Sequence, residues 1–179
     1  MVNSQTQVQN QIQTQTQAQT ASPLSENQLK LKSTEKRQLF ERKLTGLKDA
    51  KKKKTIILVD SRLNNLNKKA VMSLQQKTMA MERVSTKLRS RLTKMNQEGK
   101  DIAQFEPELA NLNQKINSLK SQVSIQLQKD YSPQITEEVK LRISAQEATT
   151  QLKTDFQNLN TQFATIHNEA LKIITQIAL

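Results

Sequence analysis

Glycine and proline are nearly absent from this chain, and the few that occur divide it into segments. The 179 residues include two glycines and three prolines, which are Gly46, Gly99, Pro23, Pro107 and Pro133. Glycine adopts left-handed backbone geometry and proline lacks an amide hydrogen, so these residues end helices most readily. The long stretches between them are therefore expected to be helical, and the predicted fold class is all-α.

The composition favours a thin fold over a thick globular one. Apolar residues make up 35% of the chain, against roughly 45–50% in ordinary globular domains. A seam between helices needs fewer apolar residues than a layered core. We therefore expect residues 25–179 to form an elongated, antiparallel three-helix coiled coil or bundle. Residues 1–24, where every second residue from Gln5 to Gln19 is Gln, are expected to form a disordered low-complexity tail, because they have little to bury.

The first helix is expected at about residues 33–96. From residue 59 onward, apolar residues recur at three- and four-residue spacings, with Lys77 in one expected place: Val59, Leu63, Leu66, Ala70, Leu74, Met81, Val84, Leu88, Leu92 and Met95. The spacing averages about 3.6 residues, which is typical of a nearly straight helix. Gly46 and the lysines that follow it indicate a bend or frayed stretch. Gly99 suits a left-handed helix cap and Asp101 an N-cap.

Two further helices are expected at about residues 103–128 and 136–178, although Pro107 restricts the start of the earlier one. Its apolar residues repeat as a heptad seam, which consists of Ile102, Phe105, Leu109, Leu112, Ile116, Leu119 and Val123. Residues 128–133 interrupt the pattern. The last helix has a seam of Leu152, Phe156, Leu159, Phe163, Ile166, Ala170, Ile173 and Ile177.

The middle helix is too short to pair with the whole of the first. At about 1.5 Å per residue, a straight third helix starting at residue 135 would extend beyond the turn at Gly99 with its seam in water. Two arrangements avoid this exposure. Residues 134 to about 145 are extended or loop back along the first helix, or the overhang contacts another copy of the chain. We favour the first arrangement.

The positive charge is concentrated in one segment. Residues 25–98 hold 20 basic and 7 acidic side chains, whereas residues 99–179 hold 8 and 9. The densest cluster consists of Lys51, Lys52, Lys53 and Lys54. Such a cluster could contact a polyanion, either nucleic acid or an anionic envelope polymer. A solvated helical face is the favoured interpretation, because specific nucleic-acid recognition normally adds aromatic stacking or base-reading groups.

No group of residues forms a recognisable catalytic, metal or cofactor site. His167 is the sole histidine and cysteine is absent, so a metal centre is not expected. The acid pairs Glu106/Glu108 and Glu137/Glu138 are each expected in a first helical turn, where they complement the helix dipole. No apolar run is long enough for a transmembrane segment, and residues 1–21 lack the features of a secretory signal. The chain is expected not to be an enzyme.

Three motifs resemble uncharacterised envelope-type helical coiled-coil proteins of candidate-phyla bacteria. They are the stretch from Asp60 to Lys69 (DSRLNNLNKK), the turn from Glu98 to Asp101 (EGKD) and the stretch from Phe105 to Leu109 (FEPEL). The similarity covers roughly residues 56–178. It implies a helical, extracytoplasmic, non-enzymatic protein and supplies no catalytic residue.

The sequence thus predicts a structural or interaction protein that acts through coiled-coil contacts, and the resemblance implies that it is a cell-envelope component. The expected partners are another copy or a helical protein, and an anionic polymer or lipid head groups. The alternative is a cytoplasmic coiled coil that binds nucleic acid or another polyanion through its basic first helix. Nucleic acid is the less favoured partner.

Overall fold

The computed structural model describes residues 26–178, and this part of the chain is helical with no strand. It contains α1 (Glu26–Thr45), α2 (Ala50–Gln97), α3 (Phe105–Leu127), the short 3₁₀ helix η1 (Glu138–Lys140) and α4 (Leu141–Ala178). The expected all-α class is confirmed. The expected tail at residues 1–24 lies outside the described residues.

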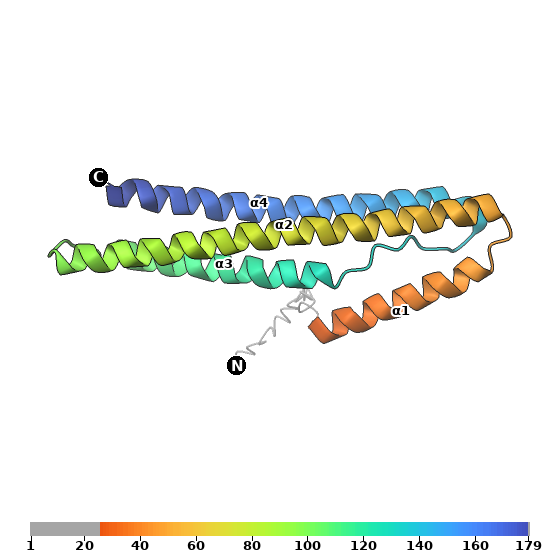
Figure 1. The fold of residues 1–179 in the computed structure, drawn as a ribbon, viewed down its shortest axis with the longest axis horizontal. Helices are drawn as coiled ribbons and strands as arrows, with labels where there is room; N and C mark the ends of the chain where they lie inside the picture. Colours follow the sequence, from red (N-terminus) through yellow and green to blue (C-terminus); the bar gives the residue numbers. More distant parts are fainter. Residues whose placement is uncertain (1–25, 179) are drawn as a thin grey trace, which may run out of the picture.

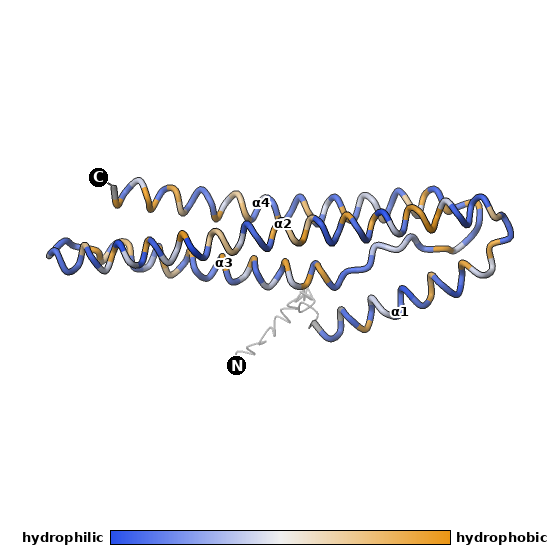
Figure 2. Tube along the Cα trace, in the orientation of Figure 1, coloured by the Kyte–Doolittle hydropathy of each residue, from blue (hydrophilic) through white to orange (hydrophobic). Residues whose placement is uncertain are grey.

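The described residues form a long, thin rod (Figure 1). Helix α3 runs antiparallel to α2, and α4 runs in the same direction as α2. Along each helix, hydrophobic and hydrophilic residues alternate at short intervals (Figure 2), as expected for helices with one apolar stripe. The main core joins α2, α3 and α4, and includes Leu74, Leu112, Ile116, Leu159 and Ile166.

The first expected helix is in fact two helices, so the described residues contain four α-helices and not three. Helix α1 ends at Thr45, just before Gly46, and Asp49 caps the start of α2. The chain reverses here, and the reversal brings Phe40 into a second apolar cluster with Ile56, Ile135 and Leu141. A continuous straight helix would carry Phe40 away from that cluster.

The turn between α2 and α3 follows the prediction for Gly99. Its φ is +79°, in the left-handed region. The backbone N–H of Lys100 donates to the Met95 carbonyl at 3.0 Å and that of Gly99 donates to the Asn96 carbonyl at 3.0 Å, which is a Schellman motif. Asp101 accepts from the N–H of Ala103 at 2.9 Å, four residues before α3 begins. Asp101 therefore caps the turn and not α3 itself.

The length mismatch is resolved within one chain. After α3 ends at Leu127, residues 128–137 are non-helical and continue in the direction of α3 toward the start of α2 (Figure 1). Helix α4 then begins at Leu141, which packs beside Ile56 near the start of α2. This arrangement is the favoured one of the two predicted, with the helix starting a few residues later than the expected residue 136. The α4 seam consequently packs along α2.

The buried seam of α2 lies one residue beyond the predicted stripe at five places. The predicted positions were Val59, Leu66, Ala70, Lys77 and Val84. The buried positions are Asp60, Asn67, Val71, Thr78 and Ser85. Four of the five are polar, so a search for apolar residues passes over them. Leu66 and Lys77 are exposed in the structure, which corrects their assignment to the seam.

Candidate functional site

The four consecutive lysines, residues 51–54, form the first turn of α2. Asp49 Oδ1 accepts from the backbone N–H groups of Lys51 and Lys52 at 2.9 and 3.0 Å. These bonds, that of Lys52 foremost, lower the pKa of the Asp49 carboxyl. Lys53 is half-buried and the other three are exposed. An anion at this end would meet both the ammonium groups and the positive end of the helix dipole.

The basic character extends along the whole of α2. The helix carries 13 basic residues: Lys51, Lys52, Lys53, Lys54, Arg62, Lys68, Lys69, Lys77, Arg83, Lys87, Arg89, Arg91 and Lys94. Its two acidic residues are both paired with other helices, Asp60 with Arg37 of α1 and Glu82 with Lys120 of α3. Helix α2 therefore supplies nearly all of the chain's formal net charge of +12.

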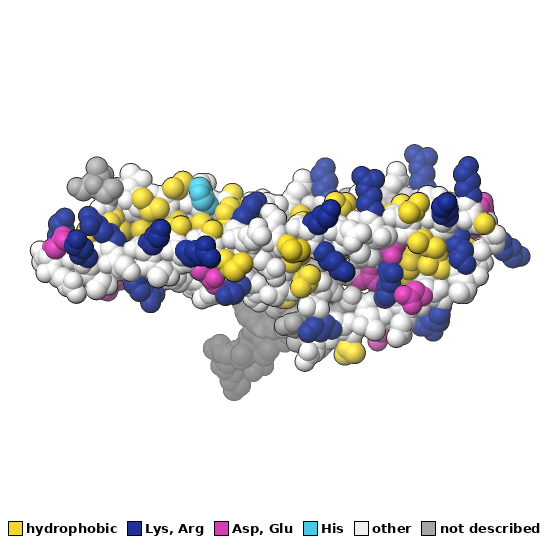
Figure 3. Space-filling model, viewed as in Figure 1, with side chains coloured by type: hydrophobic (Ala, Val, Ile, Leu, Met, Phe, Trp, Pro, Cys, Tyr) yellow, Lys and Arg dark blue, Asp and Glu magenta, His cyan; other side chains and the backbone are white. Residues whose placement is uncertain are grey.

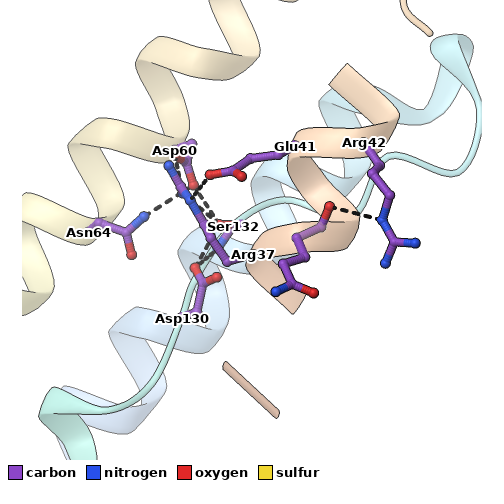
Figure 4. A network of polar contacts seen from close by, with 8 residues as sticks. Arg37, Glu41, Arg42, Asp60, Asn64, Asp130 and Ser132 are labelled. Carbon is purple, nitrogen blue, oxygen red and sulfur yellow. Dashed lines mark hydrogen bonds and ion pairs between the residues drawn. The ribbon is translucent and has the colours of Figure 1, made fainter. Parts of the chain in front are cut away.

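A buried polar network joins α1, α2 and the segment after α3 (Figure 4). We call it the Arg37–Asp60 junction. Asp60 is 3% exposed, although it stands at a seam position. Arg37 Nη1 donates to Asp60 Oδ2 at 2.6 Å and to Ser132 Oγ at 3.2 Å. Asn64 Nδ2 donates to Asp60 Oδ1 at 3.1 Å. The buried carboxylate is thus satisfied by groups from three parts of the chain.

Ser132 connects this junction to Asp130. Its Oγ lies 2.6 Å from Asp60 Oδ1 and 2.6 Å from Asp130 Oδ1, and its single proton is donated to one of them at a time. Lys36 Nζ donates to the Asp130 carbonyl at 2.8 Å. Burial lowers the pKa of Lys36 against the opposing effect of Asp130 and Asp60. The loop after α3 is therefore held to α1 by two cationic side chains.

A second network lies where α3 ends. We call it the Asn67–Tyr131 junction. Gln126 Nε2 donates to Asn67 Oδ1 at 3.0 Å and to Tyr131 Oη at 2.6 Å. The Tyr131 hydroxyl in turn donates to Asp155 of α4. Lys129 Nζ also donates to Asp155 Oδ2, at 2.8 Å. These bonds connect α2, α3 and α4 at one level of the rod.

The second junction perturbs both of its acidic groups. Burial, and then the hydrogen bond to Asp155, raise the pKa of Tyr131 far above its ordinary value. For Asp155, burial alone would raise the pKa of the carboxyl, but hydrogen bonds from Lys129 and Tyr131 outweigh burial and lower it. The stable form of the pair is therefore a neutral phenol and an ionised carboxylate.

The sequence reasoning identified neither junction. Tyr131, at the centre of the second junction, is 3% exposed. A usable signal was the pair Asp60 and Asn67, one heptad apart and in register with Leu63 and Leu74. Short polar residues at seam positions indicate buried hydrogen-bonded layers.

The histidine and the acid pairs named in the sequence analysis do not form part of either junction. His167 is exposed and stacks on Phe163. Glu106 and Glu108 lie in the first turn of α3, as predicted. Glu138 lies in the first turn of a helix, as predicted, but that helix is the short η1 that precedes α4, and Glu137 stands at the N-cap position of η1.

No group of His, Asp and Glu residues within residues 26–178 is arranged to hold a metal ion. In the same residues, no helix is both long and apolar enough to cross a bilayer. Comparison with protein-family models, curated proteins and solved structures gave no match.

We expect the bundle to lose stability in acid partly through Asp155. Its folded pKa lies below the unfolded value of about 3.9, so its ionised form stabilises the fold above about pH 4. This contribution is lost as the pH falls through the lower, folded pKa. Urea denaturation at pH 7 and pH 3 measures the effect, and Asp155→Asn should lose less stability between the two pH values than the wild type.

The matched control is Glu147→Gln, which removes an exposed carboxylate from the same helix. It should show the acid loss of the wild type. An acid loss in Asp155→Asn equal to that of the wild type would contradict the assignment.

Proposed function

We propose that this chain is a non-enzymatic structural or interaction protein, which acts through coiled-coil contacts as a rigid helical spacer. The observation that carries the proposal is the single seam along α2. It begins at Ile56, ends at Met95 and packs in succession against α1, α4 and α3. At about 1.5 Å per residue, α2 alone spans about 72 Å.

Buried polar residues support a spacer with one fixed register. Besides the two junctions, Ser85 of α2 pairs with Asn113 of α3. Sliding one helix by a turn would separate these partners and leave polar groups buried without hydrogen bonds, at a cost of about 1–3 kcal/mol for each group. Polar residues at coiled-coil seam positions commonly specify register in this way. The proposed antiparallel coiled coil would therefore hold its ends at a constant separation.

The spacer proposal predicts a fixed distance along the rod. The chain has no cysteine, so Ser61→Cys combined with Ser90→Cys introduces a unique pair of exposed labelling sites on α2. Spin labels there should give a narrow distance distribution centred at about 44 Å, the rise of 29 helical residues. The same labelled chain in urea is the control and should give a broad one. A broad or much shorter distribution in buffer would overturn the spacer function.

A second candidate function is binding of a polyanion such as nucleic acid, and the charge of α2 favours it. Thirteen basic residues against two acidic ones on one helix would attract phosphates without reading sequence. Lys51, Lys52, Lys53 and Lys54 are its proposed contact. Binding of mixed-sequence duplex DNA, compared below with binding of an acidic peptide, separates the two candidates. The envelope location that the resemblance implies stays a prediction.

A further inference from the structure

Two separate hollows lie between α2 and α4, one near the start of the two helices and one near their ends. Near the start of the two helices the hollow has a volume of about 1150 Å³, and near their ends about 520 Å³. The first hollow is lined by residues that include Lys51, Lys52, Val59, Arg142 and Ala145. The second is lined by Val84, Lys87, Leu88, Arg91, Ile174 and Ile177. We call the two hollows and the surface between them the α2–α4 groove.

The floor of this groove is apolar. The stripe that the sequence placed in the α2 seam has its members Val59 and Val84 in the two hollows, and Leu66 of the same stripe is 47% exposed. On α4, Ile174 lies in the second hollow and is 40% exposed. Figure 3 shows apolar side chains on this side of the rod among Lys and Arg side chains. A helix laid along the groove would remove this apolar surface from water.

The rim of the groove is basic and lacks the pairing found elsewhere. Three lysines of α2 are spaced 18 residues apart, which is five helical turns, so they lie in one row along the helix: Lys51, Lys69 and Lys87. Lys77 lies over the Phe163 ring, 5.4 Å from its centroid, between the two hollows. Arg142 of α4 adds a cation to the first hollow, where Glu138 is the one acidic residue among the lining residues that the structure describes.

The other two helix interfaces are closed by pairs of opposite charge. Helices α2 and α3 are joined by Glu82 and Lys120. Helices α3 and α4 are joined by Lys115 with Glu169 and by Glu108 with Lys172. Between α2 and α4, within residues 26–178, no salt bridge joins the two helices themselves. Lys52 lies 3.9 Å from Asp49 at the start of its own helix and 3.7 Å from Glu138 of η1. The acidic complement of this groove is therefore missing from the described part of the chain.

We propose that the α2–α4 groove binds an acidic amphipathic helix of a partner protein. The apolar face of that helix covers the groove floor, and its Asp and Glu side chains pair with the basic rim. A second copy of this chain does not fit, because its equivalent surface would place lysines against lysines. Charge complementarity thus selects the partner. This inference rests on the proposed interaction function and adds the class of partner that the chain binds.

The probe is a synthetic peptide of about four heptads with Leu at positions a and d and Glu at the flanking e and g positions. Repulsion between the glutamates keeps the free peptide from pairing with itself. We expect it to bind the full chain at near-physiological salt, by fluorescence anisotropy of a labelled peptide. The same peptide with Lys in place of Glu should bind at least tenfold more weakly.

Two charge-matched variants locate the binding surface. Lys87→Glu with Arg91→Glu reverses two exposed cations of the groove and should weaken peptide binding by about tenfold or more, since rim charges steer such partners. Lys68→Glu with Arg89→Glu makes the same charge change on the same helix, outside both hollows, with Arg89 facing the α3 side. This control should change the affinity less than about threefold. Ile174→Gln should weaken binding without altering circular dichroism.

Several results would overturn the proposal. One is an equal loss of affinity in both charge variants, and another is no effect of Ile174→Gln. If duplex DNA binds more tightly than the peptide and displaces it, the second candidate function replaces the proposal. A dimer by light scattering whose contacts require Ile174 would assign the groove to a second copy. The spin-label distance is independent of all these outcomes, so a rigid rod without peptide binding refutes the groove alone.

Discussion

Leu63→Ala should destabilise the chain by about 3 kcal/mol, whereas Leu66→Ala should change its stability by less than about 0.5 kcal/mol. Both substitutions remove the same atoms from α2, three residues apart. Leu63 is 3% exposed and packs with Tyr131 of the loop and Leu152 of α4. Truncating it leaves a cavity that a rod of close-packed helices cannot fill by collapse. Urea denaturation followed by circular dichroism measures both values.

This pair of variants also tests which residues form the α2 seam. The apolar stripe predicted from sequence contains both leucines, so that prediction requires similar losses. The structure buries Leu63 and leaves Leu66 47% exposed. Equal losses in the two variants would restore the predicted stripe and displace Asn67 from the core. A loss confined to Leu63 supports the polar seam.

The later helices were predictable because their seams are mostly apolar, with Gln126 of α3 and Ser144 of α4 as buried polar residues near the α3 end and the α4 start. In α3, Leu109, Leu112, Ile116 and Leu119 keep heptad spacing, and all are buried. The end of α2 was equally predictable, because Gly99 can take the left-handed backbone conformation of the helix cap without strain. Where burial is driven by apolar area, spacing in the sequence is sufficient to assign the face.

The α2 seam was not predictable in this way because its polar members depend on distant partners. Asn67 is buried against Gln126, which is 59 residues away, and Asp60 against Ser132, which is 72 residues away. A buried polar group is tolerated only when it is hydrogen-bonded, and these partners come together only in the folded chain. The reversal after Gly46 was anticipated as a bend, but the docking of α1 depends on the same long-range contacts.

The candidate sites also differ in how far they could be predicted from the sequence. The lysine run at residues 51–54 was visible in the sequence because a charge run is a local feature, although the run forms the first turn of α2 and not a bend or frayed stretch. The two junctions and the α2–α4 groove arise from residues far apart in the chain. The groove depends on Val59 and Val84, which line its two hollows and lie beside the seam and not within it.

Arg37→Ala should release α1 from the rod. Helix α1 is held by the Phe40 cluster and by the polar contacts of Lys36 and Arg37. Removing the guanidinium leaves the Asp60 carboxylate, whose side chain is 4% exposed, with neutral donors only. Loss of one partner of a fully buried pair costs about 3–5 kcal/mol. Because the Arg37 side chain is 42% exposed and water can partly replace it, we expect about 2 kcal/mol.

Hydrogen exchange shows which helix loses stability in the Arg37→Ala variant. Amides of α1 should exchange faster in Arg37→Ala by more than tenfold, while those of α3 keep their protection, because α3 does not contribute to the Arg37–Asp60 junction. Arg42→Ala is the matched control, since Arg42 is exposed and its Nε donates only to the Gln38 carbonyl of its own helix. In the Arg37→Ala background, Asp60→Asn should restore part of the stability, because it removes an unpaired buried charge. If Asp60→Asn lowers stability further, the carboxylate is not left unpaired, and α1 is held by Phe40 and its apolar neighbours alone.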